Sequence, residues 1–371
     1  MPESDKKVTK RVLIIGAGAI GGITGALLHE ANIDVCLIDK NKTHVQAIQE
    51  NGLQIEGYSH PIKVPIKDDL KKVQQQYPHI IISVKSPFTE EVMQTLEEYL
   101  TSDGLIYSFQ NGLGNTDIMA EYLPRNQIVA GVIGWGASNL GPGKLRITSS
   151  TGNFVLGFEN KESITDPRLH EMREMLQVWR PTIITEDIMG YRWAKLIINS
   201  VIATYGGLLG MTVGDMMEHP RISKLMEDLG YEGIQVADAL GIALQRVDGL
   251  NIRNFFYRPL PNNGIIKRTA KTLLTKIMKK IGARRHGRIR SSLLTDLERG
   301  GKTEVDFLNG YIVRKAKEVK LEVPINAFLV KAIHEIEAGK RTIGLDNLPE
   351  LEEVAEQSRQ IVQEQMDLIK Q

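Results

Sequence analysis

The sequence predicts an α/β fold, in which an N-terminal Rossmann-type doubly wound sheet is followed by an all-α C-terminal domain. Strand and helix patterns alternate through the first half of the chain, as in sheets that helices cover on both faces. A G-x-G-x-x-G turn, Gly16–Gly21, follows the first of these strands. From Met189 onward the pattern is only helical. We therefore divide the chain into a dinucleotide-binding domain, residues 1–186, and an all-helical domain, residues 187–371.

The glycine-rich turn lies between an apolar run, Val12–Ile15, and a helix pattern of small residues. Gly16 permits a tight turn, Gly18 lets a pyrophosphate approach the backbone, and Gly21 lets the helix pack on the strand. Free N–H groups at the start of the helix attract phosphate. The predicted cofactor-binding residues of this turn are Gly16, Ala17, Gly18, Ala19, Ile20 and Gly21.

The second predicted strand, Asp34–Asp39, ends in an acidic residue. A carboxylate at this position accepts the ribose hydroxyls of NAD and repels the extra phosphate of NADP. Asp39 therefore favours NAD(H). Lys40 follows Asp39 directly, and Lys42 lies two residues further along the chain. The residues alone leave both cofactors open.

The remaining strand patterns complete the predicted sheet. A helix pattern, Thr89–Leu100, separates two of the strands. Residues 52–68 resemble a hairpin excursion, and residues 144–158 resemble a second antiparallel pair. The further predicted strands are Ile80–Val84, Gly104–Phe109 and Thr182–Thr185.

Bulk composition favours a cytoplasmic enzyme. The one cysteine, Cys36, lies in a predicted strand, so no disulfide framework is expected and a reducing compartment is favoured. No apolar run approaches the ~18 residues that span a bilayer, and residues 1–10 lack a signal-peptide core. The eight histidines show no metal-ligand spacing, so no metal site is expected. A net charge of +1 identifies no partner.

The second half contains two long helix patterns, Gly190–Leu209 and Arg221–Leu244, and a basic insertion at about residues 251–287. Lysines lie opposite an apolar stripe there, which predicts a basic amphipathic helix. It either packs on the helical domain or docks on an anionic membrane surface or an acidic partner. Nucleic acid is disfavoured because aromatic residues do not accompany the charges after Tyr257. The tail, residues 347–371, has a helix pattern. We expect this helix to pack on the body of the protein or on a second subunit.

Lys195 is the only charged residue between Trp193 and Gly214. A lysine in such an apolar helix either extends to solvent or lies in a partly dry site that lowers its pKa. Asn199 follows four residues later and so shares a helix face with it. An ammonium and an amide on one face can polarise a carbonyl oxygen.

Three more polar residues have both a functional and an ordinary interpretation. Asn111 and Lys85 follow predicted strands, where doubly wound sheets place their ligands, but Asn-Gly is also a turn signal. Glu304 lies in the first turn of a predicted helix, where the residues alone favour ordinary dipole compensation by Glu304 and Asp306.

Seven motifs follow one another along the chain: Gly16-Ala-Gly-Ala-Ile-Gly21, Ser83-Val-Lys85, Gln110-Asn-Gly-Leu-Gly114, Trp193-Ala-Lys-Leu-Ile-Ile-Asn199, Ser291-Ser-Leu-Leu-Thr-Asp296, Lys302-Thr-Glu-Val-Asp306 and Val323-Pro-Ile-Asn326. In these motifs the chain resembles the ketopantoate reductase (2-dehydropantoate 2-reductase) family, from residue 11 to about 345, except in the basic insertion. This resemblance implies a Rossmann domain followed by a helical substrate and dimerisation domain, with the site in the cleft between the two domains.

The resemblance also implies an activity: reduction of 2-dehydropantoate to pantoate by hydride from NADPH. By motif, Lys195 corresponds to the general acid, and Glu304 would hold Lys195 and the substrate hydroxyl. Asn199 and Ser292 would orient the substrate. Asn111 and Lys85 would lie where cofactor and substrate meet. On family grounds, with Lys40 beside the 2′-phosphate, NADP(H) is favoured, while Asp39 leaves NAD(H) open.

One departure from the family pattern concerns the substrate. The family often has a second asparagine one turn after Asn199, where this chain has Ala203. A reductase of another branched 2-keto acid is therefore one alternative. A non-catalytic dinucleotide-binding protein that docks through its basic helix is another, which Lys195 and Glu304 argue against because a sensor needs no proton donor.

Overall fold

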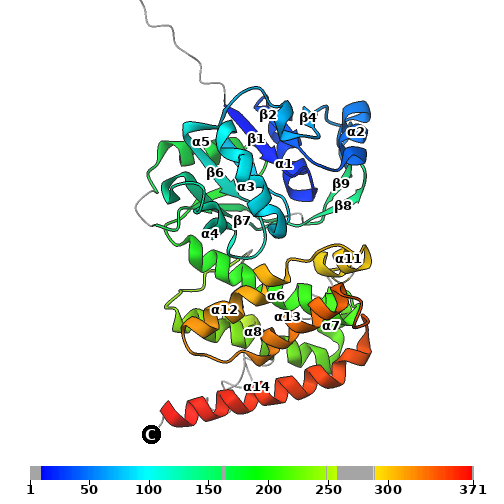
Figure 1. Ribbon diagram of the computed structural model, residues 1–371, viewed down its shortest axis with the longest axis vertical. Helices are drawn as coiled ribbons and strands as arrows, with labels where there is room; N and C mark the ends of the chain where they lie inside the picture. Colours follow the sequence, from blue (N-terminus) through cyan, green and yellow to red (C-terminus); the bar gives the residue numbers. More distant parts are fainter. Residues whose placement is uncertain are drawn as a thin grey trace, which may run out of the picture. The chain divides into compact units, whose positions relative to one another are not determined.

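The computed structural model describes residues 10–149, 151–160, 164–247, 249–256, 287 and 289–369. The chain forms two compact units, coloured blue to green and green to red in Figure 1. The N-terminal unit comprises Met1–Gln110 and Asn115–Ile188, and the helical unit comprises Asn111–Gly114 and Met189–Gln371. The short segment Asn111–Gly114 therefore belongs to the helical unit. A single division of the chain at residue 186 would assign this segment to the N-terminal unit.

An eight-stranded sheet in the order β11-β10-β7-β6-β5-β1-β2-β4 forms the centre of the N-terminal unit. Its strands pair in parallel except for the antiparallel pair of β10 and β7. The predicted α/β class is confirmed. The strands of this sheet are β1 (Arg11–Ile15), β2 (Asp34–Ile38), β4 (Ile66–Lys67), β5 (Tyr77–Ile82), β6 (Leu100–Ser108), β7 (Ile128–Ile133), β10 (Phe154–Gly157) and β11 (Thr182–Ile184).

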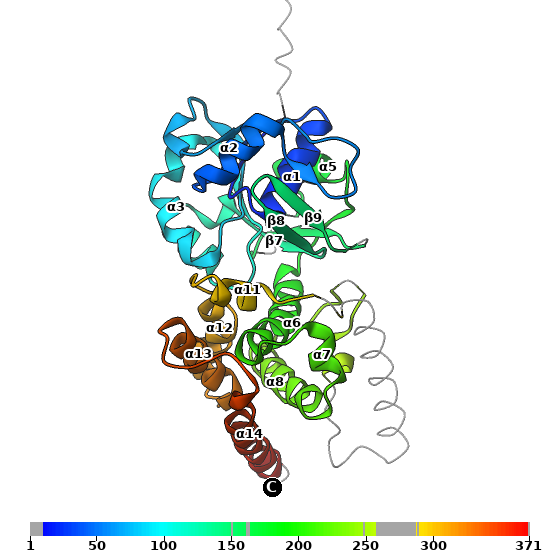
Figure 2. The ribbon, with the colours of Figure 1, turned by 90° about the vertical axis from the view of Figure 1, so that its right-hand side faces the viewer.

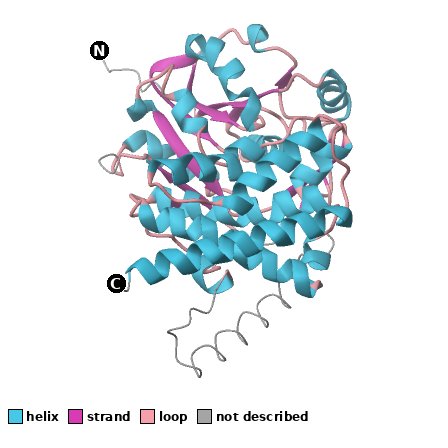
Figure 3. Cartoon of the chain, turned by 60° about the horizontal axis from the view of Figure 1, so that its bottom comes forward, coloured by secondary structure: helices cyan, strands magenta, loops and turns pink. Residues whose placement is uncertain are grey.

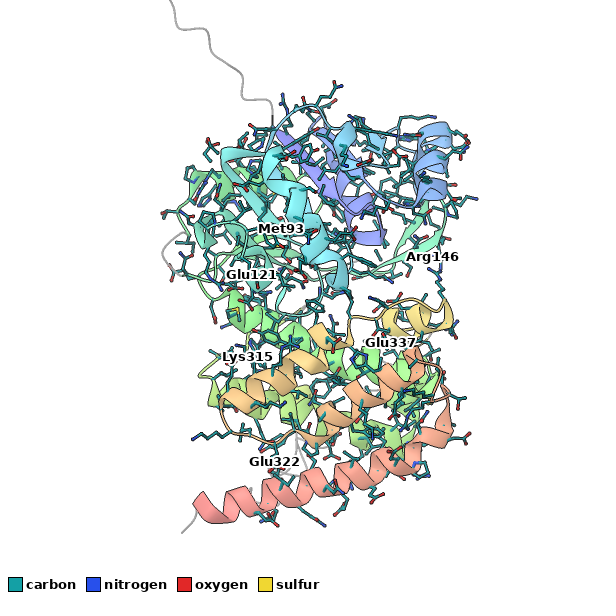
Figure 4. The ribbon with its side chains drawn as sticks, in the orientation of Figure 1. Met93, Glu121, Arg146, Lys315, Glu322 and Glu337 are labelled. Atoms are coloured by element: carbon teal, nitrogen blue, oxygen red, sulfur yellow. The ribbon has the colours of Figure 1, made fainter. Side chains whose placement is uncertain are left out.

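Two hydrophobic cores, one on each face, make the sheet doubly wound. Successive side chains of a strand point to opposite faces, so Val12 and Ile14 enter one core while Leu13 and Ile15 enter the other. Figure 2 shows α1 and α5 on one side and α3 on the other. Met93 of α3 is buried in the second core (Figure 4). The helices of this unit are α1 (Ala19–Glu30), α2 (Lys42–Asn51), α3 (Thr89–Leu96), α4 (Asn115–Met119) and α5 (Pro167–Leu176), with 3-10 turns η1 (Leu70–Lys72), η2 (Ser86–Phe88), η3 (Glu97–Tyr99) and η4 (Arg125–Gln127).

Both predicted antiparallel excursions are wrong in their pairing. β3 (Gln54–Ile55) pairs in parallel with β9 (Lys144–Ile147), while β4 pairs with β2, so residues 52–68 contain only an isolated bridge between Leu53 and Ile62. β9 pairs with β8 (Ala137–Gly141), and β10 pairs with β7. Alternating polarity identifies a strand but not its partner, which tertiary packing selects.

The predicted helix Thr89–Leu100 is too long. α3 ends at Leu96, and Leu100 already begins β6. Both long helices of the second half are present, as α6 (Ile188–Leu209) and α8 (Pro220–Ala239), but α8 ends before the predicted Leu244. The strands in Figure 3 all come from the N-terminal unit. Helices of the helical unit are α6 (Ile188–Leu209), α7 (Val213–Glu218), α8 (Pro220–Ala239), α9 (Ile252–Phe255), α11 (Ser292–Glu298), α12 (Asn309–Glu318), α13 (Pro324–Glu337) and α14 (Leu348–Ile369), with 3-10 turns η6 (Val305–Phe307) and η7 (Leu345–Asn347).

A buried carboxylate, Glu232 of α8, ties three helices together. It accepts hydrogen bonds from the backbone N–H groups of Ile325 and Asn326 (both 3.0 Å) at the start of α13, and from Ser358 Oγ (2.7 Å) of α14. Burial raises the pKa of Glu232 to about 7, against the lowering effect of these donors. The tail helix therefore packs on the body of the helical unit, as one of the two sequence interpretations predicts.

Most of the basic insertion, residues 257–286, lies outside the described residues, and the predicted amphipathic helix falls there. At the described start of the insertion, Phe255 and Phe256 are buried in the core of the helical unit. Phe256 packs so closely on α8 that a Cβ added to Gly230 would lie 2.3 Å from its ring. No helix among the described residues has the length and apolarity needed to cross a membrane.

Candidate functional site

The glycine turn between β1 and α1 has a different steric requirement at each glycine. Gly16 has φ +99°, and a Cβ there would lie 2.7 Å from the backbone carbon of Ser83, just after β5. A Cβ on Gly21 would lie 2.0 Å from the carbonyl oxygen of Gly16. A Cβ on Gly18 would meet nothing within 4 Å. The outer glycines are therefore needed for packing, and the middle one faces open space at the start of α1.

Two side chains hold Ala17, the residue at the centre of the turn. Its N–H donates to Asp39 Oδ2 (2.9 Å), and its carbonyl lies 2.9 Å from His44 Nε2. The other oxygen of Asp39 accepts the N–H of Asn41 (2.9 Å). His44 Nδ1 also accepts the N–H of Gly143 (3.1 Å), so its proton lies on Nε2, which donates to Ala17. Both oxygens of Asp39 thus already have backbone donors.

Three lysines near the turn, for which a cofactor role is expected, are exposed in the N-terminal unit. Lys40 forms an ion pair with Glu91 of α3, and Lys42 is the first residue of α2. Lys85 caps the N-terminal end of η2, just after β5. Ala19 and Ile20 begin α1 and are partly exposed.

Lys195 projects from the middle of α6, between buried neighbours Ala194 and Leu196. Burial of its ammonium lowers the pKa of Lys195 from 10.5 to about 8, and the nearby carboxylate of Glu304 acts in the opposite direction. The structure therefore places Glu304 near enough for its charge to act on Lys195. A lysine with this pKa is still mostly protonated at neutral pH but gives up its proton readily.

Asn199, one turn after Lys195, contacts the second predicted substrate-binding amide. Its Nδ2 donates to Oδ1 of Asn111 (3.4 Å). Backbone contacts hold the segment that carries Asn111: the N–H of Leu113 donates to the carbonyl of Phe307 (2.9 Å). Gly112 has φ +76°, and a Cβ there would lie 2.4 Å from the same carbonyl. The two amides and the Glu304–Phe307 region thus form one assembly.

Glu304 does not lie within the first turn of an α-helix. It caps η6, where its carbonyl accepts the N–H of Phe307 (3.0 Å), and α12 begins only at Asn309. Side chains of helix α13 contact the chain both before and after Glu304. Glu337, labelled in Figure 4, accepts the N–H of Thr303 (2.8 Å), and His334 Nε2 lies 3.0 Å from Asp306 Oδ1. Dipole compensation therefore does not explain Glu304.

The two adjacent serines differ in their surroundings. Ser291 is buried and caps α11, because its Oγ accepts the N–H of Leu294 (3.1 Å) and donates to the carbonyl of Ala203 (3.1 Å). Ser292 is exposed at the first position of α11. Only Ser292 is thus available to a ligand, while Ser291 joins α11 to α6.

Within the helical unit the structure groups Lys195 with Glu304 and Asn111 with Asn199. The predicted cofactor residues other than Asn111 all belong to the N-terminal unit. Sequence reasoning missed a set of buried polar residues at the ends of β5 and β6; their proximity to strand ends was the only signal for them. In the described part of the chain, no His, Cys, Asp or Glu residues group in threes that could hold a metal ion.

A doubly wound sheet with an open glycine turn, joined to a helical unit with a partly buried lysine beside a carboxylate, defines the class of Rossmann-type dinucleotide-binding oxidoreductases. Two family models agree with this assignment. "Ketopantoate reductase PanE/ApbA" matches residues 12–161, and its C-terminal counterpart matches residues 187–337. The chain belongs to the ketopantoate reductase family, as the sequence motifs predict.

Individual relatives cover nearly the whole chain. A 2-dehydropantoate 2-reductase of Pyrococcus horikoshii is 29% identical over 335 residues, 89% of this chain and 100% of that protein. The solved structure of a PanE/ApbA family ketopantoate reductase from Ralstonia eutropha JMP134 is 26% identical, with a TM-score of 0.72 over 89% of this chain and 99% of that one. D-mandelate dehydrogenase with NADH and anilino(oxo)acetate has a TM-score of 0.75 at 23% identity, with the same coverage, and so is similar in fold.

Proposed function

We propose that this protein reduces the ketone of 2-dehydropantoate to the hydroxyl of pantoate, with NADPH as the hydride donor. The observation that carries this proposal is Lys195, whose pKa is lowered to about 8 in an otherwise apolar helix, beside Glu304. Family membership supplies the substrate class, because the Pyrococcus horikoshii relative is a 2-dehydropantoate 2-reductase.

Lys195 acts as the general acid. Reduction of a ketone leaves negative charge on the oxygen, and the Lys195 ammonium donates a proton to that oxygen as the charge develops. A pKa near the working pH suits this step, because the group is protonated yet acidic enough to transfer its proton. Glu304 stabilises the cation and accepts a hydrogen bond from the substrate hydroxyl. Lys195 then regains a proton from water.

The two amides orient the substrate. The Asn199–Asn111 bond of 3.4 Å is long, so a substrate oxygen or hydroxyl can replace either partner at low cost. Ser292, exposed at the start of α11, binds the substrate carboxylate. These contacts fix the ketone in one orientation, which accounts for much of the rate of such reactions.

The glycine turn fits a dinucleotide. Gly18 has open space where a Cβ would lie, and no side chain caps the start of α1, so its N–H groups can hold a pyrophosphate. Lys85, after β5, contacts the ribose and nicotinamide end. When bound, the nicotinamide supplies the hydride.

The contacts of Asp39 support NADP(H) over NAD(H). An aspartate that selects NAD offers its oxygens to the ribose hydroxyls. Here Ala17 and Asn41 donate to both oxygens at 2.9 Å, so the carboxylate is held against the glycine turn. Lys42 lies beyond it, exposed, and Lys40 pairs with Glu91, which a 2′-phosphate would replace as the partner of Lys40.

The variant Lys40→Ala/Lys42→Ala tests this choice of cofactor. We expect kcat/KM for NADPH to fall about 10-fold or more, because two charge-assisted contacts are lost, while kcat/KM for NADH changes little. The measurement is steady-state kinetics with each cofactor, and Lys71→Ala, an exposed lysine of η1, is the control. An equal loss with both cofactors would contradict a 2′-phosphate site at Lys40 and Lys42.

A related 2-keto acid is the second candidate substrate. Ala203, where the family often has an asparagine, is buried and offers a methyl group in place of an amide. A substrate with fewer hydroxyls than 2-dehydropantoate would tolerate that change. Turnover across a panel of branched and hydroxylated 2-keto acids separates the two: the largest kcat/KM identifies the substrate. Docking through the basic insertion, a cytoplasmic location and a homodimer stay predictions.

A further inference from the structure

Five buried polar side chains meet where β5 and β6 end, and we call them the loop-end cluster. Each is at most 8% exposed, and all belong to the N-terminal unit. Buried polar groups are costly unless they are paired, so a group of this size indicates a specific task. The members of the loop-end cluster are Ser86, Thr89, Ser108, Gln110 and Asn115.

Thr89, the first residue of α3, is the centre of the cluster. Its Oγ1 accepts a hydrogen bond from Gln110 Nε2 (2.7 Å). The same oxygen lies 2.8 Å from the carbonyl of Ser86 and 2.9 Å from Asn115 Oδ1. A hydroxyl has one proton, so Thr89 donates to one of these two acceptors at a time. One side chain thus links three separate segments of the chain.

The other members complete the links. Gln110 Nε2 also donates to the carbonyl of Val84 (3.0 Å), and Gln110 Oε1 accepts from Ser108 Oγ (3.2 Å). Asn115 Nδ2 donates to Ser86 Oγ (3.2 Å). The loop after β5 and the loop after β6 are therefore joined by side chains rather than by backbone pairing.

The contacts of the loop-end cluster lie next in the chain to two proposed site residues, Lys85 and Asn111. Val84 and Ser86, which it holds, flank Lys85. Gln110 and Asn115, two of its members, flank the segment Asn111–Gly114 on either side. Lys85 and Asn111, which we propose to meet cofactor and substrate, therefore each have residues of the loop-end cluster or its hydrogen-bond partners on both sides in the chain. Neither Lys85 nor Asn111 belongs to the cluster.

We infer that Thr89 is a positioning residue for the reduction, which sets the loops of Lys85 and Asn111 through the loop-end cluster. The inference rests on the proposed function. Removal of the hydroxyl leaves the amide of Gln110 without its shortest contact and takes one partner from Asn115. Both loops then gain freedom at the ends of their strands, and displacements of about 1 Å near reacting groups lower rates up to ~10²-fold.

The test compares Thr89→Val, which keeps the shape and removes the hydroxyl, with Thr89→Ser, which keeps the hydroxyl. For Thr89→Val we expect kcat to fall between ~10- and ~100-fold. We also expect a larger isotope effect on kcat with NADPH deuterated at the transferred position, because hydride transfer becomes the slow step. Thr89→Ser should restore both values to within about 3-fold of the wild type. A loss of stability alone would lower the melting temperature and leave the isotope effect unchanged.

The possible outcomes are distinct. Wild-type values of kcat and isotope effect in Thr89→Val would overturn the inference and leave the proposed reduction standing. No turnover of any 2-keto acid by the folded wild-type protein would refute the proposed reduction and, with it, this inference. If Thr89→Val does not fold, Ser108→Ala removes a single outer contact of Gln110, and a fall in kcat with a larger isotope effect is again expected. Unchanged kinetics in Ser108→Ala would then count against the inference.

Discussion

Replacement of Lys195 by methionine is expected to lower kcat by roughly 10²- to 10⁴-fold, the usual contribution of a general acid. Methionine keeps the length and apolar character of the side chain, so α6 should remain intact, and the affinity for NADPH should stay within about 3-fold. The measurements are steady-state NADPH oxidation and cofactor titration by fluorescence. Lys331→Ala, on the exposed face of α13, is the matched control and should leave kcat unchanged.

The same lysine sets the expected pH dependence. Because Lys195 must be protonated to donate, kcat should be constant below its pKa of about 8 and fall as the pH rises above that value. Lys195→Met should lose this alkaline limb. A methionine variant with more than a tenth of the wild-type kcat, or with the same alkaline limb, would contradict the role of Lys195 as the acid.

Gly16→Ala and Gly18→Ala are expected to fail in different ways. Alanine at Gly16 must adopt φ +99° and place its Cβ 2.7 Å from the backbone of Ser83, so we expect a free energy of unfolding lower by roughly 1–3 kcal/mol or more. Gly18 has φ −63°, which alanine adopts freely, and open space around it. Gly18→Ala should therefore keep its stability and lose NADPH affinity, because the methyl group lies where a pyrophosphate approaches.

Chemical denaturation and NADPH titration of both variants test this pair. Equal stability of Gly16→Ala and the wild type would contradict the steric account of the turn. Unchanged NADPH affinity in Gly18→Ala would show that the open space at the start of α1 is not where the cofactor binds.

Local periodicity predicted most of the fold. β1, α1 and β2 follow from apolar runs and a glycine motif, and α6, α8 and α14 follow from long helix patterns. The pairing partners of the short strands could not be predicted from the sequence. β3 and β9 are too short to specify a register, and the residues that pair lie 90 positions apart in the chain. Nor does the sequence indicate that Asn111–Gly114 belongs with the helical unit, because that depends on the contact of Leu113 with Phe307.

The candidate site was predictable where neighbours in sequence are neighbours in space. Lys195 and Asn199 share a helix face by their spacing alone. Glu304 was not distinguishable from an ordinary helix-end carboxylate, because the charge on which it acts, that of Lys195, is far away in the chain. Thr89 gave no signal for the same reason: its burial and its bond to Gln110 exist only in the folded protein. The two backbone donors of Asp39, likewise, became known only from the structure.

The most direct test of the proposed reduction is incubation of the purified protein with NADPH and 2-dehydropantoate, with pantoate identified by mass spectrometry. We expect stoichiometric formation of pantoate and NADP⁺, with a kcat/KM in the enzymatic range of about 10⁴ M⁻¹s⁻¹ or above, and a lower value with NADH. A folded protein that binds NADPH and forms no pantoate would contradict it.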